Sequence, residues 1–272
     1  MLIRFGSALE FECAHVTPMI LNLNVHYSRA SDLVRPDNLI TDPSVPMSMY
    51  RDAFGNWRTR TAAPPGRFKV STEGLIRDSG EPDAIAAYAF EHTVDSLPDE
   101  TLAFLLPSRY CETELLAPAA CSLFGSMTPG WSRVQAICDF VHDHIGFDFQ
   151  SARPTKTAWE VYNEPRGICR DYTHLAITLC RSLNIPARYC SGYLGDVGVT
   201  TMPFPTEFAS WMEVYLAGSW HTFDPCNNQR RVGRVLIARG QDAADVAASM
   251  TFGPNQLKSL KVWTHEVQQA AA

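Results

Sequence analysis

The stretch that decides the fold is PRGICRDYTHLAITLCRSLNIPARYCSGY, at positions 165–193. Pro165 and Gly167 break the chain just before Cys169, and leucines then recur at helical spacing. The pattern predicts a buried helix from about residue 168 to residue 183. Cys169 therefore falls in the first turn of that helix.

A cysteine in a first helical turn is well placed to act as a nucleophile. The free backbone N–H groups and the positive end of the helix dipole stabilise a thiolate, and the same N–H groups can hold an oxyanion. A cysteine that only packs is the alternative, and position alone does not separate the two. A thiolate also needs an imidazole and a group that orients it. His174 points about 140° round the helix from Cys169 and lies about 7.5 Å further along it, so it is not that imidazole.

A second stretch, TEFASWMEVYLAGSWHTFDP at positions 206–225, is typical of two strands joined by a tight turn. If the turn is the two residues Ala-Gly, Trp211 lies opposite Asp224. Ala209, Trp211 and Asp224 then share one face of the sheet, because side chains alternate along a strand. A histidine at position 209 would lie diagonal to Asp224, within reach of its carboxylate.

Together these stretches resemble the transglutaminase-like superfamily, in its bacterial cysteine-protease-like branch. That family shows a G-x-C-R/Q-D-Y/F-A/T-H segment followed by R-x-x-G/N-I-P-A-R-Y-x-x-G-Y. An F-H-A-W-x-E-V-Y-L strand and a W-x-x-F-D-P strand come next. The resemblance covers roughly positions 130–235, and the β-rich part before it resembles the β-domain that precedes this core in many bacterial members.

The resemblance implies an α+β fold with a papain/transglutaminase-like core, in which the helix-start cysteine packs on an antiparallel sheet. Residues 1–95 contain short strand-like runs and predict a small all-β domain, a sandwich or barrel, with a hairpin turn at DAFGNW. We expect a helical linker at 96–129. Residues 130–272 form the transglutaminase-like core with a C-terminal return strand, and within it 231–247 are expected to be loop and short helix.

The resemblance also implies a Cys-His-Asp triad. Carried over residue by residue, Cys169 is the nucleophile and Asp224 is the orienting carboxylate, but the histidine position is occupied by Ala209. Ser210 also differs from the usual alanine. A single laboratory His-to-Ala change would explain Ala209 but not Ser210, so we favour a natural departure and leave an engineered trap open.

Two other histidines are candidates for the missing base. His221 is three residues from Asp224 and so takes the opposite face of its strand, away from Trp211. A three-residue turn would move His221 to the face of Trp211 but would move Asp224 away from it. His221 therefore does not act with Asp224 in either register. His26 could approach across the interface between the two domains.

Aromatic residues around these motifs are expected to bind substrate. The predicted substrate-binding side chains are Trp211, Tyr162, Trp159 and Phe204. Phe204 belongs to a loop at 195–207, rich in Gly, Pro and Thr, that is typical of a lid or specificity loop. Arg170 and Asp171 follow the nucleophile, and we expect them to form a structural ion pair at the helix start.

Composition and charge exclude several classes of function. The chain has 272 residues, 46% of them apolar, and a net charge of −6. The absence of a basic tract predicts no nucleic-acid partner, and the absence of a run of about 18 apolar residues predicts no membrane span. Charges interrupt the N-terminal apolar run, and the eight cysteines show no C-x-x-C pair, so we expect reduced thiols in the cytoplasm. No finger spacing or EF-hand loop occurs, so we predict no metal and no cofactor.

The leading prediction is a cytoplasmic thiol enzyme that acts on a peptide amide or other acyl bond of a peptide or protein substrate, through an acyl-enzyme at Cys169. Without an imidazole, the site loses acid–base help typically worth about 10²–10⁴-fold, and amide hydrolysis suffers most. One alternative is a catalytically silent member of the fold that binds peptides or a protein. Another is an acyltransferase or cyclase that takes an activated substrate such as a thioester. The substrate, the choice between hydrolysis and transfer, and the oligomeric state stay open.

Overall fold

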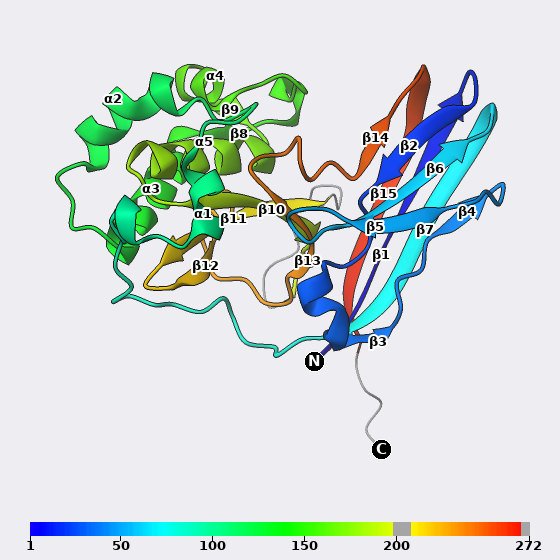
Figure 1. Cartoon of the computed structure of the whole chain (residues 1–272), viewed down its shortest axis with the longest axis horizontal. Coiled ribbons are helices and arrows are strands. Elements are labelled where there is room, and N and C mark those ends of the chain that lie inside the picture. Colours follow the sequence, from blue (N-terminus) through cyan, green and yellow to red (C-terminus); the bar gives the residue numbers. More distant parts are fainter. Residues whose placement is uncertain (198–207, 268–272) are drawn as a thin grey trace.

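A β-sandwich forms one side of the molecule. The computed structural model describes residues 1–197 and 208–267 (Figure 1). One sheet has the order β15-β1-β7-β3, with β4 also paired to β7, and the other has the order β14-β2-β6-β5. The strands are β1 (Leu2–Cys13), β2 (Thr17–Leu21), β3 (Leu33–Arg35), β4 (Ile40–Asp42), β5 (Ser48–Arg51), β6 (Trp57–Ala63), β7 (Gly66–Arg77), β14 (Ser249–Thr251) and β15 (Asn255–Val267).

Apolar side chains from the two sheets fill the space between them. This core includes Phe11 from β1, Met19 from β2 and Phe68 from β7, all nearly or fully buried. The inward side chains alternate with outward ones along β7, as expected for strands with one face on a core. The sandwich prediction for the first part of the chain is confirmed. The hairpin at DAFGNW is confirmed as well, because Arg51 of β5 pairs with Trp57 of β6.

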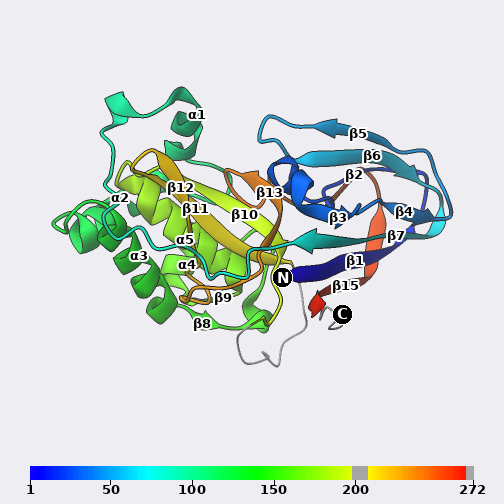
Figure 2. The same ribbon diagram turned by 90° about the horizontal axis from the view of Figure 1, so that it is seen from below.

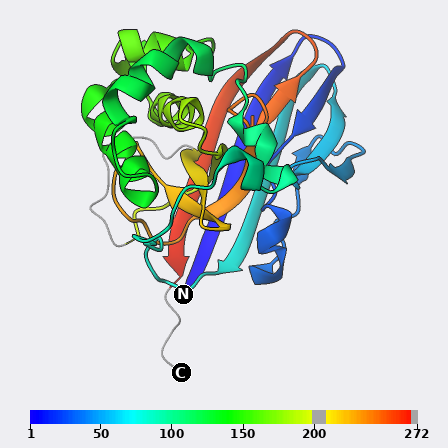
Figure 3. The ribbon, with the colours of Figure 1, turned by 60° about the vertical axis from the view of Figure 1, so that its left-hand side comes forward.

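The C-terminal strand belongs to the same sheet as the N-terminal one. β15 pairs antiparallel with β1 along the whole of β1, from Leu2 opposite Val267 to Cys13 opposite Asn255. β14 likewise pairs with β2. Figure 3 shows the red strand β15 beside the blue strand β1. The chain therefore leaves the sandwich, builds the second part, and returns to the sandwich.

The second part is an antiparallel sheet covered by helices. The sheet order is β12-β11-β10-β13, and Figure 2 shows this sheet between the helices and the sandwich. Its strands are β10 (Ala187–Tyr193), β11 (Ala209–Leu216), β12 (Ser219–Phe223) and β13 (Val235–Gly240). The helices are α1 (Asp99–Leu102), α2 (Thr113–Phe124), α3 (Trp131–His144), α4 (Ala158–Asn163) and α5 (Cys169–Ser182). Two short parallel strands, β8 (Gly146–Phe147) and β9 (Arg166–Gly167), lie beside α5.

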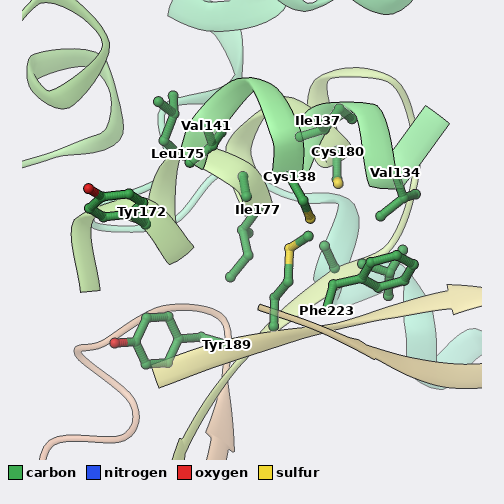
Figure 4. Close-up of a cluster of buried hydrophobic side chains, with 14 of the residues drawn as sticks. Val134, Ile137, Cys138, Val141, Tyr172, Leu175, Ile177, Cys180, Tyr189 and Phe223 are labelled. Atoms are coloured by element: carbon green, nitrogen blue, oxygen red, sulfur yellow. The ribbon is translucent and has the colours of Figure 1, made fainter. Parts of the chain in front are cut away.

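The central helix α5 is enclosed on several sides, and this explains its strong sequence pattern. Figure 4 shows its side chains Leu175, Ile177 and Cys180 among those of α3 and the sheet, and all three are fully buried. The predicted helix at about 168–183 is confirmed, with bounds at Cys169 and Ser182. The α+β prediction with a helix-start cysteine on an antiparallel sheet is confirmed too.

The short helix expected within positions 231–247 is wrong, because these residues form no helix. Val235–Gly240 instead forms strand β13, which pairs antiparallel with β10. Five of its six residues are buried, because both faces of the strand are covered. A strand that is buried on both faces has a continuous apolar run without alternation of polar and apolar residues. A buried helix segment can show the same run, so the sequence pattern alone does not separate the two.

Candidate active site

Cys169 begins α5, and its side chain is partly exposed. The carboxylate of Asp171 caps this end of the helix by accepting a hydrogen bond from the backbone N–H of Ile168 at 3.0 Å. Asp171 is fully buried, and its other oxygen pairs with Arg170 at 3.1 Å. The predicted ion pair is therefore confirmed. The arrangement presents a thiol to solvent at the N-terminus of a rigidly capped helix.

The backbone before Cys169 is held closely. A Cβ atom added to Gly167 would lie 2.6 Å from Oδ2 of Asp171, so the cap requires glycine at this position. The Nζ atom of Lys156 donates to the carbonyl of Arg166 at 2.6 Å. Because Lys156 is almost completely buried, this contact fixes the strand that leads to Cys169.

The hairpin has the predicted register. Leu216 pairs with Ser219 and Val214 pairs with His221 across a two-residue turn. Both turn residues have positive φ, as this type of tight hairpin requires. The register, extended by one pair beyond the end of β12, would place Trp211 opposite Asp224, and Arg234 contacts both of these side chains.

The two faces of β11 meet different surroundings. Ala209 packs against a small cluster that includes Trp211 and Cys190. The hydroxyl of Ser210 lies on the other face, 3.2 Å from the hydroxyl of Thr173. Thr173 in turn donates to the carbonyl of Cys169 at 2.9 Å. A serine hydroxyl, rather than an imidazole, therefore approaches the first turn of α5.

The carboxylate of Asp224 is fully engaged by other groups. Its Oδ1 accepts from the backbone N–H of Asn227 at 2.9 Å, and its Oδ2 accepts from the side chain of Asn227 at 2.8 Å. Oδ2 also pairs with Nη2 of Arg234 at 2.8 Å. Arg234 lies over the ring of Trp211, with its Cζ 5.1 Å from the ring centre. A guanidinium thus holds the carboxylate that the family resemblance assigns to an imidazole.

A second thiol, that of Cys226, follows Asp224. Its interaction with Cys169, together with burial, raises the pKa of the Cys226 thiol far above its usual range. Cys226 is partly buried, and its carbonyl accepts from Nδ1 of His142 at 3.0 Å. Sequence reasoning missed Cys226, although its place two residues after Asp224, in a segment expected near the nucleophile, was a usable signal.

Two buried tyrosines border this region. The hydroxyl of Tyr172 donates to the carbonyl of Ile145 at 2.5 Å. Burial raises the pKa of Tyr172, and it also raises the pKa of Tyr189. Both phenols therefore stay protonated at neutral pH, and neither supplies a base for Cys169.

No histidine takes the place of the missing imidazole directly. All eight histidines lie within the described residues, and no hydrogen bond there joins one of them to Cys169. His174 accepts from the N–H of Ala243 at 3.1 Å, stacks on Tyr110, and has its pKa lowered to about 3 by burial. This confirms that His174 turns away from Cys169.

The two other candidate histidines have partners of their own. His221 donates to the carbonyl of Leu216 at 3.2 Å. It lies opposite Val214, about 13 Å along β11 from Ser210. His26 is buried against the carbonyl of Phe54 at 3.1 Å, and burial lowers its pKa to about 4.

The predicted substrate-binding residues differ in their exposure to solvent. Trp159 on α4 is 38% exposed and stacks on Tyr162, which packs against His144. Trp211 is 2% exposed and lies beneath Arg234, so a ligand reaches it only if that contact opens. Phe204 and the loop residues 198–207 lie outside the described residues.

A cavity of about 490 Å³ lies beside the segment that leads to Cys169. Its lining residues are Gln150, Ser151, Ala152, Arg153, Lys156, Glu164, Pro165 and Arg166. Within residues 1–197 and 208–267, no group of three or more His, Cys, Asp or Glu side chains is arranged to hold a metal ion. In the same residues, no helix has the length and apolar character needed to span a bilayer.

Parts of the chain are similar in sequence or in fold to known proteins. The family described as the transglutaminase-like superfamily matches residues 120–225. A solved structure from Cytophaga hutchinsonii, named "putative cysteine protease", is 27% identical and superposes with a TM-score of 0.85 over 100% of this chain and 92% of that one. The periplasmic domain of TgpA from Pseudomonas aeruginosa covers 81% of this chain and 76% of its own, at 14% identity and a TM-score of 0.40.

A curated relative matches a shorter part of the chain. An uncharacterized protein of Mycobacterium leprae (strain TN) is 32% identical over 91 residues, which is 32% of this chain and 32% of the relative. The match thus spans about a third of that relative. Residues 120–225 therefore match the transglutaminase-like superfamily, and the chain shares its fold over its whole length with the Cytophaga protein.

Proposed function

We propose that this protein is a thiol enzyme that forms an acyl-enzyme at Cys169, with the family histidine position replaced by Ala209, and that its best donors are activated acyl groups on a peptide or protein. The observation that carries the proposal is the partly exposed Cys169 thiol at the capped N-terminus of α5. A thiolate there gains from the helix dipole and from free N–H groups.

The reaction follows from what surrounds Cys169. The thiolate attacks the acyl carbon, and the electron pair that moves to the carbonyl oxygen is stabilised by N–H groups of the first turn of α5. Collapse expels the leaving group, and water or an amine then resolves the acyl-enzyme. The thiolate of a thioester, or the phenolate of an activated ester, leaves as a stable anion and needs no proton. An amide needs a protonated nitrogen, and the site lacks the imidazole that would supply the proton.

The engaged state of Asp224 supports a second candidate, a catalytically silent protein that binds peptides. A carboxylate paired with Arg234 at 2.8 Å and with Asn227 is not available to orient a base. In this candidate the exposed ring of Trp159 and the cavity beside Lys156 would serve for binding only. Eight free cysteines suit a reducing compartment, and this supports the cytoplasmic location in either case.

An ester and an amide of the same acyl group separate the two candidates. The reduced protein is mixed with a p-nitrophenyl ester and, separately, with the p-nitroanilide of the same acid, and p-nitrophenol or p-nitroaniline release is followed. We expect a burst of about one equivalent with the ester, loss of the burst in Cys169→Ala, and little turnover of the anilide. Cys121→Ala is the matched control, because Cys121 is an exposed thiol on α2 outside the site.

The outcomes assign the protein to one candidate. A burst that survives in Cys169→Ala contradicts the acyl-enzyme proposal. The absence of any burst in the wild-type protein favours the silent candidate. Rapid anilide turnover would show that an acid–base group acts in the site after all.

A further inference from the structure

The cavity of about 490 Å³ beside the start of α5 has a cationic lining. Three of its four charged lining residues are the cations Arg153, Lys156 and Arg166, and the fourth is the carboxylate Glu164. The whole chain carries a net charge of −6. The surplus of cations is therefore a local property of this cavity, and it favours an anionic ligand.

A smaller cavity of about 130 Å³ has the opposite character. Its lining includes the carboxylates of Asp83 and Asp224, and both of these pair with Arg234. Its own cation, Arg230, donates to the backbone carbonyl of Asp83. The charges beside Asp224 are thus already matched, so the larger cavity is the better place for a charged ligand.

The three cations of the larger cavity differ in how far they are paired. Arg153 pairs with Glu160 and with Glu164, each at 2.9 Å. Lys156 is buried, donates to two backbone carbonyls and lies 3.8 Å from the Glu164 carboxylate. Arg166 is exposed, and within residues 1–197 and 208–267 no hydrogen bond or ion pair engages its guanidinium. Arg166 is therefore the cation that is available to a ligand.

The wall of this cavity is joined to the first turn of α5. Nη2 of Arg170, the residue after Cys169, donates to the carbonyl of Arg153 at 2.7 Å. Arg166 precedes Cys169 by three residues, and three residues of extended chain span at most about 11 Å. A peptide that lies at Cys169 covers the same distance with about three of its own residues.

We propose that this cavity takes the side-chain carboxylate of an Asp or Glu residue of a bound peptide, and that Arg166 pairs with it. The acidic residue lies within about three residues of the group that meets Cys169. The substrate class is then an acidic peptide segment. The proposal rests on the proposed function only in requiring that a peptide binds at Cys169, which the silent candidate requires as well.

A carboxylate fits this cavity better than a phosphate does. A guanidinium presents two parallel N–H groups that match the two oxygens of one carboxylate. A phosphate carries up to two negative charges, and the Glu164 carboxylate in the wall repels a doubly charged group more strongly than a singly charged one. One unpaired guanidinium therefore favours a single carboxylate.

Protection of Cys169 from alkylation tests the proposal without any need for acyl transfer. The rate at which iodoacetamide labels Cys169 is measured at increasing concentrations of acetyl-Ala-Ala-Glu-Ala-Ala-amide. The same peptide with Gln in place of Glu is the neutral counterpart. We expect half-protection at a concentration at least about threefold lower for the Glu peptide, which is the size of a partly solvated ion pair. In 1 M NaCl, where the Debye length is about 3 Å, the difference is expected to shrink.

Arg166→Gln is expected to bring the ratio of the two half-protection concentrations to about one, and Arg166→Lys to keep part of the preference. The backbone around Arg166 is held through its carbonyl by Lys156, so these side-chain changes leave that contact in place. Arg35→Gln is the matched control, because Arg35 is an exposed arginine in the sandwich, and it is expected to keep the full preference. The neutral peptide with a free C-terminal carboxylate shows whether a chain end can replace the acidic side chain.

Three results would overturn the proposal. These are equal protection of the wild-type protein by the Glu and Gln peptides, no protection by either peptide, and a Glu preference that survives in Arg166→Gln. A preference for the free C-terminal carboxylate over the Glu side chain would likewise contradict the assignment. The ester burst is measured on the same preparation. A burst without a Glu preference defeats this proposal alone, whereas a Glu preference without a burst supports it and defeats the acyl-enzyme proposal.

Discussion

Oδ2 of Asp224 lies 2.8 Å from Nη2 of Arg234, and the two side chains are almost completely buried. The same guanidinium bonds to Asp83 at 2.9 Å and covers the ring of Trp211. The family resemblance predicts an imidazole next to the carboxylate of Asp224 on this face of the sheet. The structure has the guanidinium of Arg234 and the methyl group of Ala209 there. Arg234 supplies the partner that the buried carboxylate of Asp224 needs.

Restoring the imidazole alone is expected to give a small gain. In Ala209→His the new ring competes with Arg234 for Asp224, so it lacks the group that would orient it. We expect amide hydrolysis to rise by no more than about tenfold, against about 10²–10⁴-fold for a positioned acid–base group. Turnover of a peptide p-nitroanilide measures the gain. A rise of a hundredfold or more would show that Asp224 is free to orient a base.

Removing the guanidinium is expected to destabilise the protein strongly. Arg234→Gln leaves the buried carboxylate of Asp224 without its cation, and breaking a buried pair in this way costs about 3–5 kcal/mol. Arg4→Gln is the control, because Arg4 is 53% exposed in its pair with Glu73, and exposed pairs contribute about 1 kcal/mol or less. Urea denaturation gives both free energies of unfolding. Equal losses for the two variants would be inconsistent with the buried pair as described.

The glycine before the nucleophile is expected to be essential for the helix start. In Gly167→Ala the new methyl group meets Oδ2 of Asp171 at 2.6 Å, so the cap must shift. Loss of a helix cap costs about 0.5–2 kcal/mol. Gly146→Ala on the neighbouring strand is the control, because the nearest atom there is 3.7 Å away. Thermal unfolding measures the difference, and unchanged stability in Gly167→Ala would contradict the role given to the cap.

Buried histidines predict a loss of stability in acid. The pKa of His174 is lowered by burial from 6.5 to about 3, so between these values the unfolded chain binds a proton that the folded chain does not. Stability is therefore highest above about pH 6.5 and falls as the pH decreases towards 3. Urea midpoints from pH 7 to pH 4 measure the slope. His174→Gln is expected to flatten it and His265→Gln, at an exposed position, to leave it unchanged; a flat wild-type profile would contradict the prediction.

The parts of the site that depend on local sequence periodicity could be predicted from the sequence. The helix that begins at Cys169 is marked by a break and a regular apolar spacing. The hairpin register follows from a two-residue turn, which fixes the partner of each strand residue. These two features predict that Cys169 lies at the helix start and that His221 and Asp224 lie on opposite faces of the sheet.

The partners of the site residues depend on tertiary contacts that no local pattern encodes. Arg234 reaches Asp224 from the start of β13, a strand that was expected to be loop and helix. Asp224 also accepts from Asn227, through a turn that the N–H of Asn228 closes on the Asp224 carbonyl. A pairing of this kind is decided by how the loop after a strand folds back, so only the structure shows which groups meet.

The reactivity of Cys169 tests the central claim most directly. The reduced protein is treated with limiting iodoacetamide at pH 6, and the labelling rate of each cysteine is followed by peptide mass spectrometry against free cysteine in the same solution. We predict that Cys169 is labelled faster than free cysteine, because the helix start stabilises its thiolate, while the buried Cys138 is labelled far more slowly. Labelling of Cys169 at or below the rate of free cysteine would contradict the assignment of Cys169 as the nucleophile.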